Sequence, residues 1–142
     1  GNAVAQGPVG VWLDEDKNGH IEIYNCADAR TVSDGALLEW MCAKTPSSTG
    51  RLCGRVKFIN DKGKAELKKR GRSVANVLSM PVLCISPSDG GGLWRGGVYS
   101  VYLDKRANAY VTPRGAGQLH VKGCKVLNTR FTCAEDVWTR VP

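Results

Sequence analysis

Short segments in which apolar and polar residues alternate dominate the chain, a pattern typical of antiparallel strands joined by turns. Residues 9–13 alternate in this way, and residues 20–24 repeat the alternation after Asn18-Gly19, a dipeptide that favours a hairpin. The segments are short and are separated by clusters of Gly, Asn, Asp, Pro and Ser. We predict eight strands, at residues 9–13, 20–24, 52–58, 77–86, 93–103, 109–112, 118–122 and 131–141.

Two stretches depart from this alternation. Ser33 is a candidate N-cap for a short helix over residues 36–42, in which Leu37, Leu38 and Met41 share one face. The second stretch, residues 64–70, is basic and ends before a glycine. Its pattern fits a turn of helix and a flexible loop equally well, and the sequence leaves both open.

The predicted fold class is all-β, an eight-stranded antiparallel up-and-down barrel with one short helix in the insertion after the second strand. Closure removes the unpaired edges that an open sheet of eight strands would expose. With 142 residues, of which 42% are hydrophobic, the chain has the length of one domain. We expect an N-terminal arm at residues 1–8 and a single barrel at residues 9–142. A barrel of this size is either filled by side chains or holds one small ligand.

The cysteines indicate disulfides and therefore an oxidising compartment. All six lie far apart in the sequence without C-x-x-C spacing, and the chain has only two histidines, so a zinc site is not expected. Ala3 and Ala5 resemble a signal peptidase site after removal of an export segment. We expect a periplasmic or secreted protein that uses no metal and no cofactor.

The formal net charge of +7 is concentrated in the basic stretch 62–72. Such a stretch is either a solvated face or a site for a polyanion. For an exported protein we favour lipid headgroups, lipopolysaccharide or acidic glycans over nucleic acid, because the stretch lacks aromatic residues on which bases would stack. No apolar run is long enough for a transmembrane segment, so we expect none.

Several segments, in order, resemble an uncharacterised family of exported bacterial proteins with a lipocalin-like fold, known as domain of unknown function 2147. The resemblance covers most of the chain, although residues 27–51 are longer than the usual link between their two flanking cysteines. The matching segments are Gly10-Val11-Trp12, Asp14-Glu15-Asp16, residues 21–26, residues 52–56, residues 94–99 and residues 137–141. The resemblance implies a lipocalin-like barrel but no particular chemistry.

The resemblance also implies structural roles. In lipocalins a G-x-W on the first strand packs its indole at one barrel end beneath an arginine of the last strand, and Gly10, Trp12 and Arg140 match these positions. We expect Arg140 to stack on Trp12, a contact worth about 0.5–2 kcal/mol. Trp138, in the last matching segment, is assigned a structural role with them.

Topology and the family resemblance together suggest one disulfide pairing. Cys26 and Cys53 lie at the end of strand two and the start of strand three, where a bridge would close the 27–52 excursion. Cys124 and Cys133 flank the connection between the last two strands. The remaining pair, Cys42–Cys84, would attach the insertion helix to the barrel.

Candidate catalytic and metal-binding residues are few. Asp14-x-Asp16-x-Asn18-Gly19 matches the first half of a calcium loop, but position twelve is Asn25 and a strand precedes the loop, so we interpret the segment as a turn. His20 and His120 fall on outward-facing positions. No catalytic motif occurs, and we expect no enzymatic activity.

The large aromatic residues suggest a ligand pocket, although plain core packing would also account for them. We predict a pocket for a hydrophobic or amphipathic molecule, with the helix of Trp40 as a lid and Met41 as an adaptable contact. The predicted ligand-binding residues are Trp40, Met41, Trp94, Tyr99, Tyr102 and Tyr110. The predicted function is that of an exported small-molecule-binding protein, monomeric or weakly dimeric. The alternative is a surface module without internal ligand, which binds a protein, a glycan or an anionic envelope component through residues 62–72 and the insertion 27–51.

Overall fold

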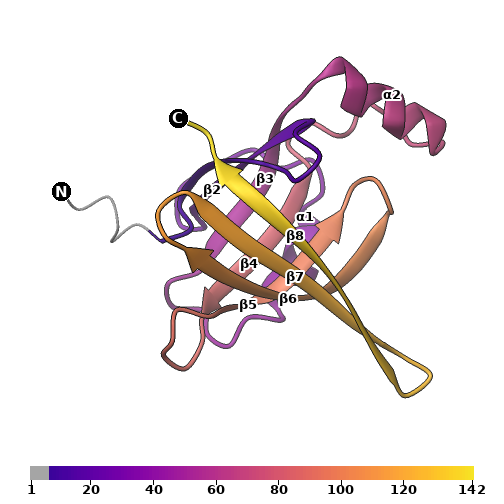
Figure 1. Cartoon of the computed structure of the whole chain (residues 1–142). Coiled ribbons are helices and arrows are strands. Elements are labelled where there is room, and N and C mark those ends of the chain that lie inside the picture. Colours follow the sequence, from indigo (N-terminus) through magenta and orange to yellow (C-terminus); the bar gives the residue numbers. More distant parts are fainter. Residues whose placement is uncertain (1–6) are drawn as a thin grey trace.

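The computed structural model describes residues 7–142, in which eight antiparallel strands close into a barrel (Figure 1). The strands follow one another around the barrel in chain order, and β1 pairs with β8 to complete the ring. Their bounds are β1 (Gly10–Leu13), β2 (Gly19–Asn25), β3 (Leu52–Ile59), β4 (Pro81–Pro87), β5 (Trp94–Ser100), β6 (Lys105–Arg114), β7 (Gln118–Leu127) and β8 (Arg130–Arg140). This is the fold class predicted from the alternation.

Apolar and polar residues alternate along the strands because every second side chain of a strand points into the barrel. Trp12 pairs with Ile21 across β1 and β2, and both side chains are buried. Leu83 on β4 and Leu119 on β7 have no exposed surface. The apolar positions of successive strands therefore meet in one core inside the ring.

The two ends of the barrel differ. Because neighbouring strands run in opposite directions, successive connections lie at alternate ends. One end carries the β1–β2, β3–β4, β5–β6 and β7–β8 connections; we call it the open end, and it faces right in Figure 1. The other end, which we call the closed end, carries the remaining three connections together with the start of β1 and the end of β8.

Helix α1 (Gly35–Cys42) packs on the outer wall of β4 and β5. Its N-cap is Asp34, whose side chain accepts a hydrogen bond from the backbone N–H of Leu37 at 3.0 Å; the expected cap, Ser33, lies one residue too early. Gly97 allows the close approach, because a Cβ at this position would lie 2.6 Å from the Cα of Met41. The insertion helix therefore covers a side of the barrel.

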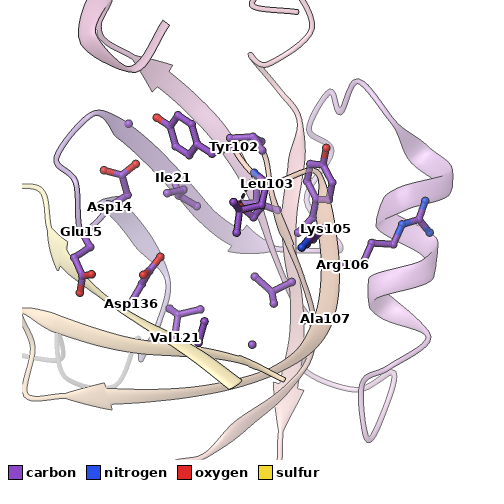
Figure 2. A pocket seen from close by; sticks show the side chains of 18 of the residues that line it. Asp14, Glu15, Ile21, Tyr102, Leu103, Lys105, Arg106, Ala107, Val121 and Asp136 are labelled. Carbon is purple, nitrogen blue, oxygen red and sulfur yellow. Dashed lines mark hydrogen bonds between the residues drawn. The ribbon is translucent and has the colours of Figure 1, made fainter. Parts of the chain in front are cut away.

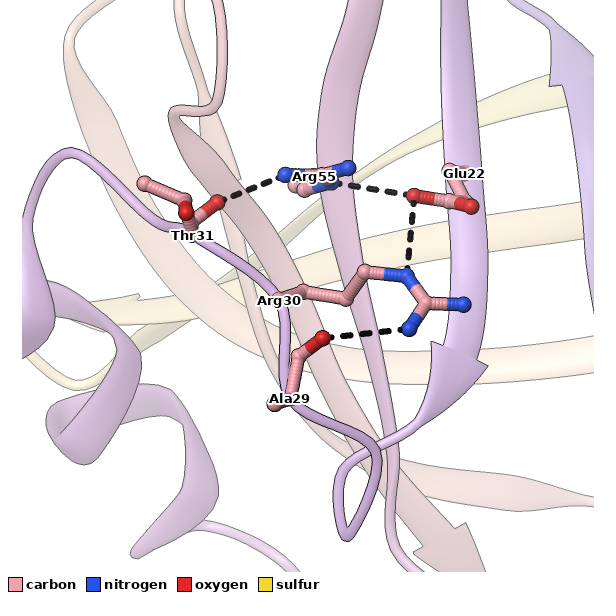
Figure 3. Close-up of polar contacts among 5 residues, drawn as sticks. All are labelled: Glu22, Ala29, Arg30, Thr31 and Arg55. Atoms are coloured by element: carbon pink, nitrogen blue, oxygen red, sulfur yellow. Dashed lines mark hydrogen bonds and ion pairs between the residues drawn. The ribbon is translucent and has the colours of Figure 1, made fainter.

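A polar cluster holds the start of the insertion against the outer wall (Figure 3). The Nε of Arg55 donates to Glu22 at 3.0 Å, and the Nε of Arg30 lies 3.7 Å from the same carboxylate oxygen. Arg55 also donates to the carbonyl of Thr31 at 2.7 Å. Glu22 thus offsets part of the positive charge of the two arginines, and these contacts hold the start of the long connection against β2 and β3.

The basic stretch contains a second helix, α2 (Asp61–Lys69). The side chain of Asn60 caps it by accepting a hydrogen bond from the N–H of Gly63 at 2.8 Å. Leu67 is fully buried and Gly63 lies against Ile59, so α2 is anchored to the barrel by one face while its lysines face solvent. Residues 7–142 therefore hold two helices; the pattern predicted the first and left the second open.

The later strands differ in length from those predicted. β4 starts at Pro81 because residues 77–80 form a turn, and β5 stops at Ser100 before another turn. β6 and β7 are longer than predicted, whereas β8 has the predicted length and begins one residue earlier. The hairpin of β7 and β8 extends past the barrel, as Figure 1 shows, and there both faces meet solvent, so apolar alternation does not mark its full length.

Residues 7 and 8, the end of the expected N-terminal arm, pack against the barrel. Pro8 is fully buried, and its carbonyl accepts a hydrogen bond from the indole N–H of Trp12 at 2.8 Å. Residues 7 and 8 thus belong to the closed end. The signal peptidase resemblance at Ala3 and Ala5 lies outside the described residues.

Candidate functional site

A cavity with a volume of about 450 Å³ lies inside the barrel at the open end. Strands β2 to β8 all contribute to its walls, and the β1–β2 and β5–β6 turns contribute to its rim. Its position follows from the barrel: the closed end is filled by large side chains, whereas the open end is wide.

The inner wall of the cavity is mostly aliphatic. Ile21, Val98 and Val121 line it from three different strands, and each faces inward by the register of its strand. The indole of Trp138, on β8, also contributes to the lining. A wall of this composition favours the apolar body of a ligand over a fully polar solute.

Four carboxylates gather at one side of the mouth (Figure 2). Three belong to the β1–β2 turn, and the fourth, Asp136, projects from β8 beside them. Burial raises the pKa of Asp136, and the three carboxylates of the turn raise it further. None of the four forms an ion pair within residues 7–142. This side of the mouth therefore holds uncompensated negative charge.

The turn itself uses two of its carboxylates. Asp14 accepts a hydrogen bond from the N–H of Asn18 at 2.9 Å, which stabilises the turn, and Glu15 accepts one from the N–H of Val137 at 3.0 Å. Burial raises the pKa of Asp14 as well. The engagement of Asp14 inside the turn agrees with our interpretation of this segment as a hairpin connection rather than half of a calcium loop.

The opposite side of the mouth is basic. Lys105, Arg106 and Lys125 all contribute to the lining. Arg106 points from the cavity toward helix α1, as Figure 2 shows, and its guanidinium carbon lies 5.4 Å from the centroid of the Trp40 ring. The mouth thus has an acidic and a basic side around an apolar interior.

Of the six predicted ligand-binding residues, Tyr99 and Tyr102 line the cavity. Burial raises the pKa of Tyr102 to about 12, so its hydroxyl remains protonated at neutral pH. The hydroxyl of Tyr99 donates to Asp104 at 2.8 Å and accepts from Arg72, which in turn pairs with Asp104 at 2.8 Å. This network ties the chain after α2 to the β5–β6 turn at the mouth.

The other four predicted residues lie outside the cavity. Met41 is buried between α1 and the outer wall, and Trp40 beside it is partly exposed between Lys44 and Arg106. The prediction that α1 is a lid must therefore be corrected, because a disulfide and Gly97 hold it on the side of the barrel.

Trp94 and Tyr110 also point elsewhere. Trp94 lies beside Gly7 at the closed end. Tyr110 lies on the outer face between Arg95 and Lys122, whose cationic groups are 5.6 and 5.7 Å from its ring centroid. Aromatic residue type alone does not reveal which face of a strand a side chain occupies. The alternation of valines with polar residues along the strands is a better guide to the residues that line the cavity.

The residues expected at the closed end do meet there. The guanidinium carbon of Arg140 lies 4.3 Å from the centroid of the Trp12 ring. Gly10 has a φ of 140°, and any side chain there would collide with the Arg140 guanidinium. Trp138, assigned a structural role with these residues, instead lies nearer the middle of the barrel and lines the cavity.

Three disulfides form in the expected pairing, Cys26–Cys53, Cys42–Cys84 and Cys124–Cys133. The first two are neighbours, because Cys53 and Cys84 face each other across β3 and β4, and their four sulfur atoms lie within 4.8 Å of one another. Such a cluster would resemble a four-thiolate metal site if reduced, but here each sulfur is bonded to a partner sulfur.

The histidines lie apart from each other. The ring of His20 packs against Phe58 at a centroid distance of 5.2 Å, and His20 is among the residues that line the cavity. His120 lies 3.1 Å from Glu135. The buried hydroxyl of Ser86 accepts a hydrogen bond from the N–H of Ser47, and Ser100 accepts one from the N–H of Leu103. Each of these serine contacts satisfies the backbone of a turn or connection.

Residues 10–140 match the model of an uncharacterised protein family conserved in bacteria, DUF2147. The chain belongs to this family. The match confirms the resemblance drawn from the sequence motifs. No curated protein and no solved structure matches the chain. Within residues 7–142, neither helix has the length and apolarity required to cross a membrane.

Proposed function

We propose that this DUF2147 protein binds a small hydrophobic or amphipathic molecule in the cavity at the open end of its barrel. The observation that carries the proposal is the combination of about 450 Å³ of space, an aliphatic wall and a charged mouth. An apolar body would occupy the interior, and a polar headgroup would remain at the mouth beside the acidic or the basic side chains. The proposed role is binding without chemical conversion.

We also propose that the protein works outside the cytoplasm, in the periplasm or beyond the cell. The support is a bacterial family together with three disulfides, since such bonds persist in oxidising compartments. Retention of an amphipathic molecule in the cell envelope would suit a protein in this location.

The alternative drawn from the sequence joined the basic stretch and the insertion 27–51 into one binding surface. Helix α1 of the insertion packs on the wall of β4 and β5, whereas α2 belongs to the β3–β4 connection at the open end. The two elements therefore lie on different parts of the barrel. We retain the cavity as the proposed site for a small ligand.

A pair of substitutions on one strand tests this proposal. Ala107 lines the cavity, and the next residue, Asn108, is exposed on the outer face. Ala107→Phe should occupy much of the cavity and weaken binding of a fluorescent fatty acid or of a neutral apolar dye by at least about tenfold. Asn108→Phe adds the same side chain outside and should leave binding unchanged. Fluorescence titration of both variants provides the measurement.

The proposal fails if neither probe binds, or if both variants bind as tightly as the parent protein. Native mass spectrometry of protein isolated from its own cells, with solvent extraction, then tests for a natural ligand. A stoichiometric apolar or amphipathic molecule that Ala107→Phe excludes would identify the ligand class.

A further inference from the structure

The exposed apolar side chains of this protein gather at one end. Among residues 7–142, six large hydrophobic side chains are about half exposed or more. All six lie in connections of the open end or in strand segments next to them. They are Phe58, Leu78, Leu103, Val126, Leu127 and Phe131. Scattered exposure of single residues is normal for a globular protein, but concentration at one end marks an interaction surface.

The tip of the β7–β8 hairpin, residues 125–132, is the most prominent part of this surface. Val126 pairs with Phe131 across the hairpin, and these side chains are 65% and 63% exposed. The adjacent Leu127 is 61% exposed. Figure 1 shows the hairpin extending beyond the barrel on the same side as α2. The Cys124–Cys133 disulfide joins the two strands just below the tip, so the tip keeps its form without packing on the barrel.

The charges around these apolar side chains are predominantly positive. Lys125 and Arg130 belong to the tip itself, and neither forms an ion pair within the described part of the chain. Residues 60–80 carry six Lys and Arg residues against two carboxylates, and five of the six lie in or next to α2. Three of the four carboxylates of the mouth, on the β1–β2 turn and β8, are exposed as well, but Figure 1 shows α2 and the tip extending beyond that turn. The outermost parts of the open end are therefore apolar and basic together.

We propose that the open end docks on an anionic lipid bilayer, with the apolar tip of β7–β8 inserted between headgroups and the lysines of α2 lying over them. Apolar side chains flanked by cations are the combination that holds proteins at an anionic membrane surface. α2 and the tip project on the same side of the barrel, which suits contact with a broad surface better than with a narrow peptide. A second copy of this chain would bring the same positive charges face to face.

This inference goes beyond the proposed function and does not depend on a ligand. Docking would nevertheless affect how a ligand reaches the cavity, because the cavity opens at the docking end and Leu127 and Lys125 line its wall. A lipid-derived molecule would then pass between the bilayer and the cavity without crossing bulk water.

Vesicle co-sedimentation tests the docking. The oxidised, full-length protein should bind vesicles of phosphatidylcholine mixed with phosphatidylglycerol, and bind pure phosphatidylcholine vesicles much more weakly. Val126→Ser/Phe131→Ser should reduce the partition coefficient at least about tenfold, because the tip no longer has apolar area to insert. Lys125→Gln/Arg130→Gln should reduce it about fivefold for each charge removed. Val126, Arg130 and Phe131 are exposed and Lys125 is half-buried at the cavity mouth, so loss of folding is not expected.

A matched control removes the same charge elsewhere. Lys44 follows α1 on the side wall, and Arg114 lies at the closed end; both are exposed. Lys44→Gln/Arg114→Gln lowers the net charge as much as the tip variant does, and it should leave binding to the anionic vesicles nearly unchanged.

Insertion has a separate readout. A tryptophan at the tip, Phe131→Trp, should shift its emission to the blue and be quenched by lipids with brominated chains. Ala116→Trp, in the β6–β7 turn of the closed end, should show neither change. The four native tryptophans supply the background to subtract.

Three outcomes would overturn the inference. The first is absence of binding to anionic vesicles. The second is binding that the tip variants do not weaken or that the Lys44/Arg114 control weakens equally, since attraction would then be set by net charge alone. The third is a dimer that Val126→Ser/Phe131→Ser dissociates in analytical ultracentrifugation, which would identify a second copy as the occupant. Failure of the fatty-acid titration would leave the vesicle result unaffected and would count only against the cavity.

Discussion

The closed and open ends of the barrel use charge in opposite ways. At the closed end Arg140 donates hydrogen bonds to the carbonyls of Gly7, Val9 and Ala116 at 2.7–3.0 Å while its guanidinium stacks on Trp12. At the open end Lys125 and Arg130 form no ion pair with any described residue, and the acidic side of the mouth is likewise uncompensated. The closed end engages its arginine fully inside the fold, whereas the open end leaves these charges without an opposite charge.

This difference explains how one barrel combines stability with binding. Groups that are fully hydrogen-bonded and packed hold the first strand against the last, which keeps the ring closed. Groups that lack partners at the open end cost stability or contribute little to it, and they are the groups that an external ligand or surface can engage. Substitutions at the two ends should therefore change the stability of the fold by different amounts and, for some residues, in opposite directions.

The largest difference in the free energy of unfolding should be between substitutions of two aromatic residues, Trp12 and Phe131. Trp12→Ala removes a buried indole and its hydrogen bond to Pro8, and should lower the free energy of unfolding by about 3–5 kcal/mol. Phe131→Ala, at the exposed tip, should change it by no more than about 0.5 kcal/mol. Urea denaturation measures both. Comparable losses would show that the tip is part of the core and would contradict the comparison.

Removal of two of the disulfides should lower stability by amounts that differ less than those of the two aromatic substitutions. Cys42–Cys84 spans 42 residues and attaches α1 to the barrel, whereas Cys124–Cys133 spans 9 residues in the hairpin. Restriction of the unfolded chain predicts a loss of about 4 kcal/mol for the double alanine variant of the first and about 2.5 kcal/mol for that of the second. Thermal unfolding of each variant, with circular dichroism as the readout, checks the order. The reverse order would mean that the hairpin arm stabilises the barrel more than α1 does.

The smallest effect concerns two carboxylates, Asp136 and Glu22. Removing their charges should shift the melting temperature in opposite directions. The pKa of Asp136 is raised from 3.8, so its carboxyl holds a proton more tightly in the folded than in the unfolded state. Its ionisation therefore opposes folding as the pH rises through the interval between 3.8 and the raised value. Asp136→Asn should raise the melting temperature at pH 7 on the order of 1–2 °C, and this gain should vanish below the unfolded pKa.

Glu22 provides the control for that measurement. It lies on the outer wall between Arg30 and Arg55, so Glu22→Gln leaves two guanidinium groups without their carboxylate. We expect this variant to lower the melting temperature at pH 7. An Asp136→Asn variant that also melts lower would show that the acidic side of the mouth stabilises the fold.

Alternation predicted the barrel because inward positions must be apolar and strand geometry repeats every two residues. It predicted the cavity residues less well. Trp40 and Tyr110 were chosen for their aromatic character, but Tyr110 faces outward by the register of β6 and Trp40 lies on a helix outside the barrel. Asp136 was not selected, although its parity with Trp138 on the last strand places it on the inner face. The sequence did contain a signal for Asp136: it lies two residues before Trp138, so both side chains face the same side of the last strand.

The amino-acid sequence by itself determined the order of the strands, since alternation and turn residues act over short stretches of chain. The family resemblance implied the contacts of the closed end and, together with topology, the disulfide pairing. Only the tertiary structure decided where the insertion helix lies and which residues face the cavity. It also decided that exposed apolar and basic side chains from three connections share one end. Those features depend on which segments meet after the ring closes, and contacts between distant segments leave no periodic trace in the sequence.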